Sequence, residues 1–427
     1  MSKIKPHSAY VDSGVSWIGQ IPSGWSIQPF RHTFRESSEV NGAVPVGTML
    51  SISGYRGVEQ KHYEDENRRR TAAELETYRV VRPGQLAVNT MWLNYGGLGV
   101  SELTGHVSPA YRAYWISSSF EKRYLHHLMR SDTYIDAYTS RLTGIRPNSL
   151  QMSRDNLMAF PIIRPPREEQ VRIANFLDRE TAEIDAFIAD QKELVRLLAE
   201  RRAAAISHAV TDVPGSFQVP VRRFTTSLGQ GWSPVCEQEA AEPGQWGVLK
   251  VGCVNGATFR PAENKALPSE LEPRTEFSAM RGDVLVSRGN TRELVGSAAL
   301  VDTDYPTLLV SDLLYRIRVD MRRVSNEYFV LALASNFVRG QIESSAKGSS
   351  GSMQKISQGD LLSLRIWLPS IKVQDEIVAK VAQETAELDA AMTDAREAVA
   401  LSRERRAALI SAAVTGKIDV REHGAVA

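Results

Sequence analysis

Two stretches of the sequence collect side chains that can form paired hydrogen bonds with the edges of nucleic-acid bases. Residues 89–97 follow a predicted strand at Gln85–Val88, and residues 287–293 follow one at residues 283–287. Arginine can contact guanine, and asparagine can contact adenine, through two hydrogen bonds each. Glycines in both stretches let the backbone approach a ligand closely. The candidate base-contacting residues are Asn89, Thr90, Trp92, Asn94 and Tyr95 in the first stretch and Arg288, Asn290, Thr291 and Arg292 in the second.

A second pair of polar, glycine-containing stretches, residues 143–149 and 347–355, precedes two long helical segments. Backbone amides and lysines in such stretches suit contact with phosphate groups. The candidate DNA-contacting residues are Arg146, Asn148, Lys347, Ser349, Gln354 and Lys355. Loops of this composition are also ordinary turns, so composition alone leaves both interpretations open. Their occurrence at the same place in both halves of the chain favours binding.

The sequence lacks the motifs that a catalytic site would require. Gly97-Leu98-Gly99 begins like a dinucleotide-binding loop, but Glu102 stands where the last glycine is needed. Two Glu-x-Lys triplets, at residues 59–61 and 263–265, resemble part of a nuclease site. However, no aspartate in residues 13–58 or 213–262 completes that site. There is no phosphate-binding GxxxxGK[ST] loop, no Asn-Pro-Pro-aromatic tetrapeptide and no HExxH spacing among the eight histidines. We therefore expect no catalytic residue, no metal site and no cofactor in this chain.

An internal repeat must position these loops. Glu180-Thr181-Ala182-Glu183 returns as Glu384-Thr385-Ala386-Glu387, an offset of 384 − 180 = 204 residues, and residues 165–211 align without a gap onto 369–415. A solenoid unit has only about 20–50 residues. The repeat therefore indicates a duplicated domain-plus-helix module, which suits a two-fold target or partner.

The repeated segments have the apolar spacing of coiled-coil helices. Counting in sevens gives the predicted apolar seam Ile173, Leu177, Ile184, Phe187, Leu194 and Leu198 in the first helix and Ile377, Val381, Leu388, Ala391, Ala395, Ala398 and Leu409 in the second. The first helix is bulky at mid-length and the second is small there, which favours antiparallel pairing within the chain. Alternatively, each helix packs only on its own globular domain.

The globular segments combine predicted strands with predicted helices, at residues 120–129 and 326–337, and so indicate two α/β domains. The predicted division is 1–164 for the first domain, 165–213 for the first long helix, 214–367 for the second domain, 368–418 for the second long helix and 419–427 for a C-terminal tail. The two domains share this plan but little residue identity. Two dissimilar domains joined to near-identical helices are expected if the domains recognise different targets while the helices do the same task.

Bulk composition is that of a globular protein, with 427 residues, 42% hydrophobic and 24% charged. No apolar run approaches the roughly 20 residues of a membrane span, and the first residues lack the apolar core of a signal peptide. We therefore expect a cytoplasmic protein without a membrane partner. The net charge is only +1, but residues 1–164 hold 19 Lys/Arg against 14 Asp/Glu, a net of +5. This distribution is compatible with DNA binding.

Three segments carry a resemblance to a known family. Residues 10–25, from Tyr10 to Trp25, are similar to the N-terminal signature of the specificity subunits of type I restriction–modification enzymes. Residues 168–174 and 409–418 are similar to the conserved helices of that family. Residues 371–376 of the second copy keep Gln374 but not the Glu-Gln pair of the first copy. The resemblance covers nearly the whole chain.

The resemblance implies two target-recognition domains joined by an antiparallel two-helix coiled coil, each domain reading half of a split DNA target. It also implies that this chain is not catalytic. Two methyltransferase subunits and the restriction subunits would be separate chains and would carry S-adenosylmethionine, ATP and Mg. Three alternatives stay open: a coiled-coil adaptor that binds no DNA, the specificity subunit of a related methyltransferase–nuclease system, and a stand-alone enzyme.

Overall fold

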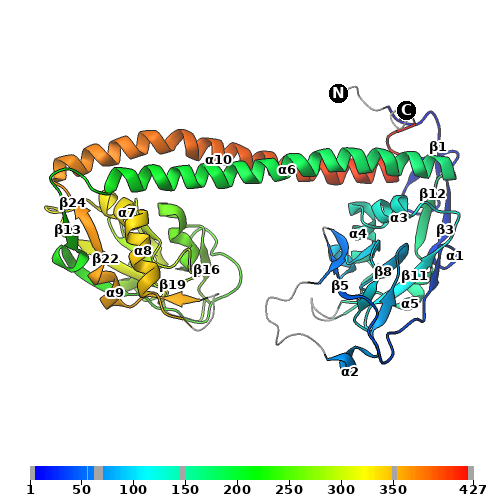
Figure 1. Ribbon diagram of the computed structural model, residues 1–427, viewed down its shortest axis with the longest axis horizontal. Coiled ribbons are helices and arrows are strands. Elements are labelled where there is room, and N and C mark those ends of the chain that lie inside the picture. Colours follow the sequence, from blue (N-terminus) through cyan, green and yellow to red (C-terminus); the bar gives the residue numbers. More distant parts are fainter. Residues whose placement is uncertain (1–4, 55, 62–70, 145–149, 349–352, 422–427) are drawn as a thin grey trace. The chain divides into compact units, whose positions relative to one another are not determined.

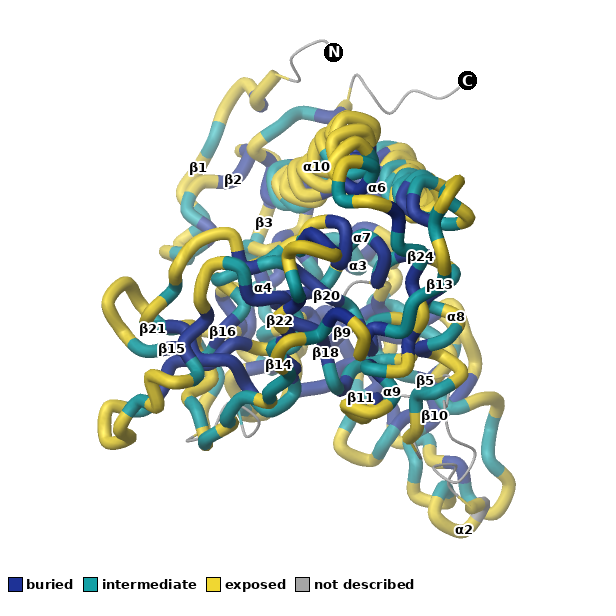
Figure 2. Tube along the Cα trace, turned by 90° about the vertical axis from the view of Figure 1, so that its left-hand side faces the viewer, coloured by how far each residue is buried: buried dark blue, intermediate teal, exposed yellow. Residues whose placement is uncertain are grey.

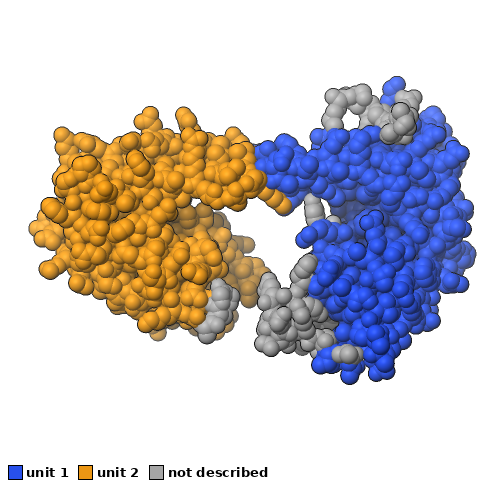
Figure 3. All heavy atoms as spheres, in the orientation of Figure 1, with its two compact units in different colours: residues 1–191, 397–427 blue, residues 192–396 orange. Residues whose placement is uncertain are grey.

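The structure is a computed structural model that describes residues 5–54, 56–61, 71–144, 150–348 and 353–421. It divides into two compact units, residues 1–191 with 397–427 (unit 1) and residues 192–396 (unit 2; Figure 3). Two 44-residue helices, α6 (Arg167–Val210) and α10 (Ile371–Val414), each begin in one unit and end in the other (Figure 1). The first and last residues of the two helices are separated by the repeat offset, since 371 − 167 = 414 − 210 = 204. Each copy of the repeat therefore folds into a helix with the same bounds.

Unit 1 contains two four-stranded sheets and two strand pairs. One sheet has the order β4-β11-β8-β9 and the other β6-β5-β10-β7, while β1 pairs with β2 and β12 with β3. The strands are β1 Tyr10–Asp12, β2 Gln20–Pro22, β3 Ser26–Pro29, β4 Phe34–Glu36, β5 Thr48–Ser53, β6 Gly57–Gln60, β7 Arg79–Val81, β8 Gln85–Val88, β9 Leu98–Val100, β10 Gly105–Val107, β11 Arg112–Ile116 and β12 Pro161–Arg164. The helices are α1 Phe30–Thr33, α2 Ala72–Leu75, η2 Leu93–Tyr95, α3 Lys122–Met129, α4 Asp132–Thr139 and α5 Arg154–Met158.

Unit 2 repeats the topology of both four-stranded sheets and of the β3–β12 pair. Its sheets have the orders β14-β22-β18-β20 and β16-β15-β21-β17, while β13 pairs with β24 and β19 with β23. The strands are β13 Phe217–Pro220, β14 Thr225–Gln230, β15 Gly247–Leu249, β16 Asn264–Ala266, β17 Ser278–Ala279, β18 Val284–Ser287, β19 Gly289–Asn290, β20 Ala298–Leu300, β21 Tyr305–Leu309, β22 Leu314–Val319, β23 Gln354–Lys355 and β24 Arg365–Leu368. The helices are η4 Val221–Arg223, η5 Val251–Ala257, η6 Thr275–Phe277, α7 Asn326–Ala334, α8 Asn336–Ser345 and α9 Gln358–Ser363.

The two units share details that a chance likeness would not produce. Each has one parallel strand pair at the same place, β5 with β10 and β15 with β21. The predicted strands β8 and β18 are buried along their whole length, whereas the outward side of α10 is exposed (Figure 2). The predicted helix at 326–337 is in fact two helices, because Ser335 ends α7 and its hydroxyl caps α8 by accepting from the Val338 N–H. The duplicated α/β plan is therefore present in the folded chain.

A buried glutamine joins the start of each long helix to its own domain. In unit 1 the Gln170 Oε1 accepts from the Glu121 N–H at 2.7 Å, at the start of α3. In unit 2 the Gln374 Oε1 accepts from the Ser325 N–H at 2.9 Å, at the start of α7. Both side chains are fully buried, and they are the same residue of the repeat, since 374 − 170 = 204. Each glutamine therefore accepts a hydrogen bond from a backbone N–H at a helix N-terminus, where N–H groups have no acceptor within the helix.

Inside each unit the two long helices pair antiparallel through crossed ion pairs. In unit 2 the Arg202 Nε of α6 lies 2.8 Å from the Asp389 Oδ1 of α10. In unit 1 the Arg406 Nε of α10 lies 2.9 Å from the Asp185 Oδ1 of α6. The two arginines are repeat partners, and so are the two aspartates, since 406 − 202 = 389 − 185 = 204. The two contacting positions lie 202 − 185 = 17 residues apart in the repeat, about 25 Å along a helix. Both contacts can form only when the helices run in opposite directions, so the ion pairs confirm the antiparallel pairing.

Of the thirteen predicted seam residues, five are buried, six are half-buried and two are exposed, and one of the two seam positions in each heptad is shifted by one residue. Leu177, Ile184, Val381 and Ala395 are buried. The prediction is wrong for Phe187 and Leu194, which are 44% and 40% exposed, and Ala391 and Ala398 are only half-buried. The other predicted positions are Ile173, which is buried, and Leu198, Ile377, Leu388 and Leu409, which are half-buried. The residues that take the shifted positions are Thr181, Ile188, Val195 and Arg202 in α6 and Thr385, Met392, Val399 and Arg406 in α10.

The reason for the shift is that the first turns of α6 bury two faces. Ile173, from which the count in sevens started, packs in the core of unit 1 together with Phe176 and Trp25 rather than only against the other helix. Counting from it therefore placed every second seam position one residue too early. The proposed match of bulky against small residues is wrong as well, because Met392 and Val399 occupy the seam of α10. Each helix packs both on its domain and on the other helix.

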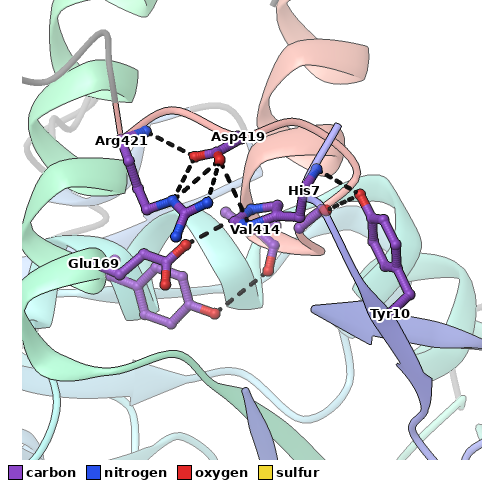
Figure 4. A network of polar contacts seen from close by, with 8 residues as sticks. His7, Tyr10, Glu169, Val414, Asp419 and Arg421 are labelled. Atoms are coloured by element: carbon purple, nitrogen blue, oxygen red, sulfur yellow. Dashed lines mark hydrogen bonds and ion pairs between the residues drawn. The ribbon is translucent and has the colours of Figure 1, made fainter. Parts of the chain in front are cut away.

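The end of α10 closes on the first residues of unit 1. The Asp419 N–H donates to the Lys5 carbonyl at 2.8 Å, and the Tyr10 hydroxyl donates to the Gly416 carbonyl at 2.9 Å. Figure 4 shows His7 between the carboxylates of Glu169 and Asp419, at 3.6 and 3.9 Å. The segment predicted as a tail therefore packs on the domain through residue 421. None of the helices in the described ranges combines the length and hydropathy of a membrane-spanning segment.

We predict that Gln374→Ala destabilises unit 2 by about 1–3 kcal/mol, because it leaves the buried Ser325 N–H without an acceptor. Denaturant unfolding, followed for the transition of unit 2, measures this change. The control is Gln383→Ala, an exposed glutamine of the same helix, which should leave the transition unchanged. Equal shifts for the two variants would contradict the role of Gln374.

Candidate nucleic-acid interface

The two predicted loops of unit 2 lie side by side because β19 pairs antiparallel with β23. Gly289 is opposite Lys355, and Asn290 is opposite Gln354. The Ile356 N–H donates to the Arg288 carbonyl at 3.0 Å and extends the pairing. The sequence predicted both loops but not their contact. The pairing joins the base-contacting candidates and the phosphate-contacting candidates into one surface.

Unit 1 contains a related junction. The Met152 N–H donates to the Thr90 carbonyl at 3.3 Å, as Ile356 does to Arg288. Met152 and Ile356 are repeat partners, since 356 − 152 = 204, whereas Thr90 and Arg288 are not. Thr143 and Gln151 exchange two backbone hydrogen bonds, as Lys347 and Lys355 do. The two loops of each unit therefore form one candidate interface per domain through similar backbone contacts, although the β19–β23 pair has no counterpart among the described residues of unit 1. Arg146, Asn148 and Ser349 lie outside the described residues.

The candidate interface of unit 2 is polar and cationic. Lys347, Lys355 and Arg292 are exposed, and Arg292 lies 3.9 Å from Glu343. The Arg288 guanidinium is partly exposed and lies 3.9 Å from the Asp312 carboxylate. The remaining candidates, Asn290, Thr291 and Gln354, are half-buried. Asp312 and Glu343 position the two guanidinium groups without burying them, so both can still reach a ligand.

The candidate interface of unit 1 is aromatic instead. Trp92 and Tyr95 are 55% and 59% exposed, and Asn94 is half-buried. Asn89 and Thr90 are only 4% and 8% exposed, which argues against base contact by these two residues. The Asn89 Oδ1 accepts from the Met91 N–H at 3.2 Å, which makes Asn89 part of the loop framework. Unit 1 thus presents rings where unit 2 presents cations and amides.

A half-buried arginine holds the inner side of the loop in unit 1. The Arg130 guanidinium, at the end of α3, donates to four backbone carbonyls: those of Ser53, Gly54, Gly96 and Leu98, at 3.2, 2.7, 3.0 and 2.6 Å. Burial lowers the pKa of Arg130 to about 10, so the group stays charged near neutral pH. Four charge-assisted hydrogen bonds fix the loop against the domain.

Unit 2 uses an arginine for the same purpose from another position. The Arg339 guanidinium of α8 donates to the carbonyls of Arg292, Glu293 and Val295. Burial lowers the pKa of Arg339. Arg130 and Arg339 are not repeat partners, so sequence comparison of the two halves could not pair them. A signal was present, because each arginine lies beside an apolar helical stretch, where an unpaired charge would be costly.

Histidine side chains, which can bind metals, lie at two places in unit 1. His126 accepts from the Val100 N–H at 3.3 Å, and burial lowers its pKa to about 3, so it is a neutral framework residue. His127 lies 2.8 Å from Asp178. Within the described residues, the one group with metal-ligand spacing is His7, Glu169 and Asp419. There the Asp419 carboxylate already binds Arg421 through both oxygens, which lowers the pKa of Asp419 to about 2 and makes this an ion-pair network.

Comparison with known proteins gives relatives in one family. No protein-family model matches the chain. The specificity subunit of the type I restriction enzyme EcoEI of Escherichia coli is 31% identical over 181 residues, and that of EcoKI of E. coli strain K12 is 25% identical over 313 residues. These alignments cover 40% and 69% of this chain but only 30% and 65% of the relatives. The chain therefore spans less than two thirds of either relative.

The fold is shared with a solved structure from a study of complex assembly and conformational transition of the type I R-M system. The TM-score is 0.59 at 17% sequence identity, over 92% of this chain and 98% of the other. The predicted fold class, two α/β domains with a long-helix coiled coil, is confirmed. The family resemblance drawn from the sequence is confirmed as well, because the curated proteins to which this chain is similar are specificity subunits of type I restriction enzymes.

Proposed function

We propose that this chain is the DNA-specificity subunit of a type I restriction–modification complex, in which each unit reads one half of a split target. The observation that carries the proposal is the pair of loop junctions at Thr90–Met152 and Arg288–Ile356. Both units close this junction with a comparable backbone hydrogen bond, while the side chains that the two loops present differ. A repeated frame with different contact residues suits the reading of two different short sequences.

The proposal assigns binding to this chain and chemistry to its partners. The methyltransferase subunits would bring S-adenosylmethionine, and the restriction subunits would bring ATP and Mg, acting on DNA in the cytoplasm. Lys347, Lys355 and Arg292 in unit 2 would contact phosphates or bases, and Trp92 and Tyr95 would do so in unit 1. The alternative of an adaptor that binds no DNA leaves these exposed cationic and aromatic loops unexplained.

The direct test is DNA binding and methyl transfer with and without the methyltransferase subunit. The complex should bind its own target duplex more tightly than a random duplex and should methylate it. The chain alone should transfer no methyl group from S-adenosylmethionine. Methyl transfer by the isolated chain, or equal affinity of the complex for both duplexes, would refute the proposal.

For unit 2 we predict that Arg288→Ala relaxes sequence preference in one half of the target only. A lost bidentate contact costs about 1–3 kcal/mol of discrimination at that base pair. Sequencing of methylated sites in cells that carry the variant measures the preference at every position. Arg322→Ala, which removes an exposed arginine of the same unit outside the two loops, is the matched control. Relaxation in both halves, or in neither, would remove Arg288 from the reading surface.

We further propose that the exposed leucines of the long helices dock the two methyltransferase subunits. Leu197 of α6 and Leu401 of α10 are 48% and 57% exposed, and they are repeat partners, since 401 − 197 = 204. Large apolar side chains exposed at equivalent positions mark a contact surface. Two equal surfaces on one chain suit two copies of the same partner.

We predict that Leu197→Glu alone reduces the bound methyltransferase from two copies to one, because it places a charge in one of two equal contacts. Leu401→Glu should do the same, and the double variant should bind none. Native mass spectrometry counts the copies. Val235→Glu, at a residue 88% exposed in unit 2 but outside the helices, is the control. Two bound copies on the double variant would exclude this docking surface.

A further inference from the structure

Among the described residues of unit 1, the most exposed tryptophan and tyrosine side chains lie in the loop that forms its candidate interface. Trp92 and Tyr95 are 55% and 59% exposed, and their ring centroids are 5.4 Å apart with an angle of 54° between the planes. Met91 beside them is 38% exposed. Exposed aromatic surface of this kind is unfavourable in water and is a frequent feature of binding sites.

The loop holds these rings outward through a closely packed backbone. Leu93 between them is fully buried. The Gly97 and Tyr95 N–H groups both donate to the Trp92 carbonyl, at 2.8 and 3.0 Å. A side chain at Gly97 would lie 2.6 Å from that same carbonyl oxygen, and one at Gly54 would lie 2.2 Å from the Tyr95 oxygen. The buried Leu93 and the close backbone packing therefore hold the two rings on the surface.

The Arg130 clamp fixes the same loop from the inner side. Its hydrogen bonds to Gly96 and Leu98 hold the two residues that follow Tyr95 and Gly97. The bond to Gly54 holds the segment whose backbone approaches Tyr95. The charged anchor and the glycine contacts thus prepare the position of the rings before any ligand binds, which reduces the entropy lost on binding.

We propose that Trp92 and Tyr95 form a stacking platform for an unstacked base in the half of the DNA target read by unit 1. The proposal rests on the proposed function. A ring can meet the face of a base only where the duplex is kinked or a base is extruded, because the faces are otherwise covered by stacking. Residues 287–296 of the corresponding loop contain no aromatic residue. Unit 1 therefore distorts its half of the target, and unit 2 reads the other half by polar contacts.

The affinity test uses the complex with its methyltransferase subunits and duplexes with one or the other half of the target scrambled. Trp92→Ala should weaken binding of the intact target about 5- to 140-fold, the range for loss of one stacked base. Trp92→Phe should restore most of the affinity, because it keeps a ring. The control is Trp115→Ala, which removes another exposed tryptophan of unit 1, 39% exposed on β11. With the half read by unit 1 scrambled, Trp92→Ala should have no further effect.

Photocrosslinking identifies the contact itself. With 5-iodouracil placed at each position of the target in turn, the complex should crosslink through Trp92 or Tyr95 at positions in one half only, as mapped by mass spectrometry. Crosslinks that avoid both residues, or unchanged affinity for Trp92→Ala, would overturn the platform. Since the wild-type complex must still prefer the target over random DNA, either result would leave the proposed function intact. Loss of that preference in the wild-type complex would refute the proposed function instead.

Discussion

The antiparallel pairing of two copies of the same helix is the constraint on which the rest of the structure depends. Arg202 with Asp389 and Arg406 with Asp185 are one contact made twice, once in each unit. The arginines are only 19% and 22% exposed, so these pairs are shielded from solvent more than ordinary surface ion pairs. A parallel arrangement would place each arginine opposite the wrong part of the other helix. The crossed pairs therefore specify direction and register together.

From this pairing follows the equivalence of the two domains. Each domain receives the start of one helix, fixed by a buried glutamine, and the end of the other: Val414 in the core of unit 1 and Val210 in that of unit 2. The loop junctions then occur at the same positions of the two sheets. The long helices are similar in the two halves of the chain, while the loops differ, as Trp92 and Arg288 illustrate. Under the proposed function, such a division would let the loops change what is read without changing how the helices pair.

Much of the architecture could be predicted from the sequence because it depends on local patterns. The bounds of α6 and α10 differ by the repeat offset that the sequence shows. The strand at Gln85–Val88 follows a turn that the sequence also shows. The phase of the seam could not be fixed, because Ile173 serves the domain core and the helix pair at once. Phe187 was assigned to the seam for that reason alone and is exposed.

The candidate site was predictable only in part, because its assembly depends on contacts between distant residues. Composition indicated the loops at Asn290 and Lys355, but their adjacency is a property of the β19–β23 pair. Asn89 has the chemistry of a base-reading residue, yet it is buried in the loop framework. The clamps of Arg130 and Arg339 act on backbone carbonyls, and a sequence carries no pattern for which carbonyls come together.

The central claim is that one chain reads two separate short sequences with two equivalent domains. Sequencing of all methylated sites in cells that contain this chain and its methyltransferase tests it most directly. The account predicts a single motif made of two specified groups of bases, separated by a stretch in which every base is accepted. One continuous motif, or methylation without sequence preference, would contradict it.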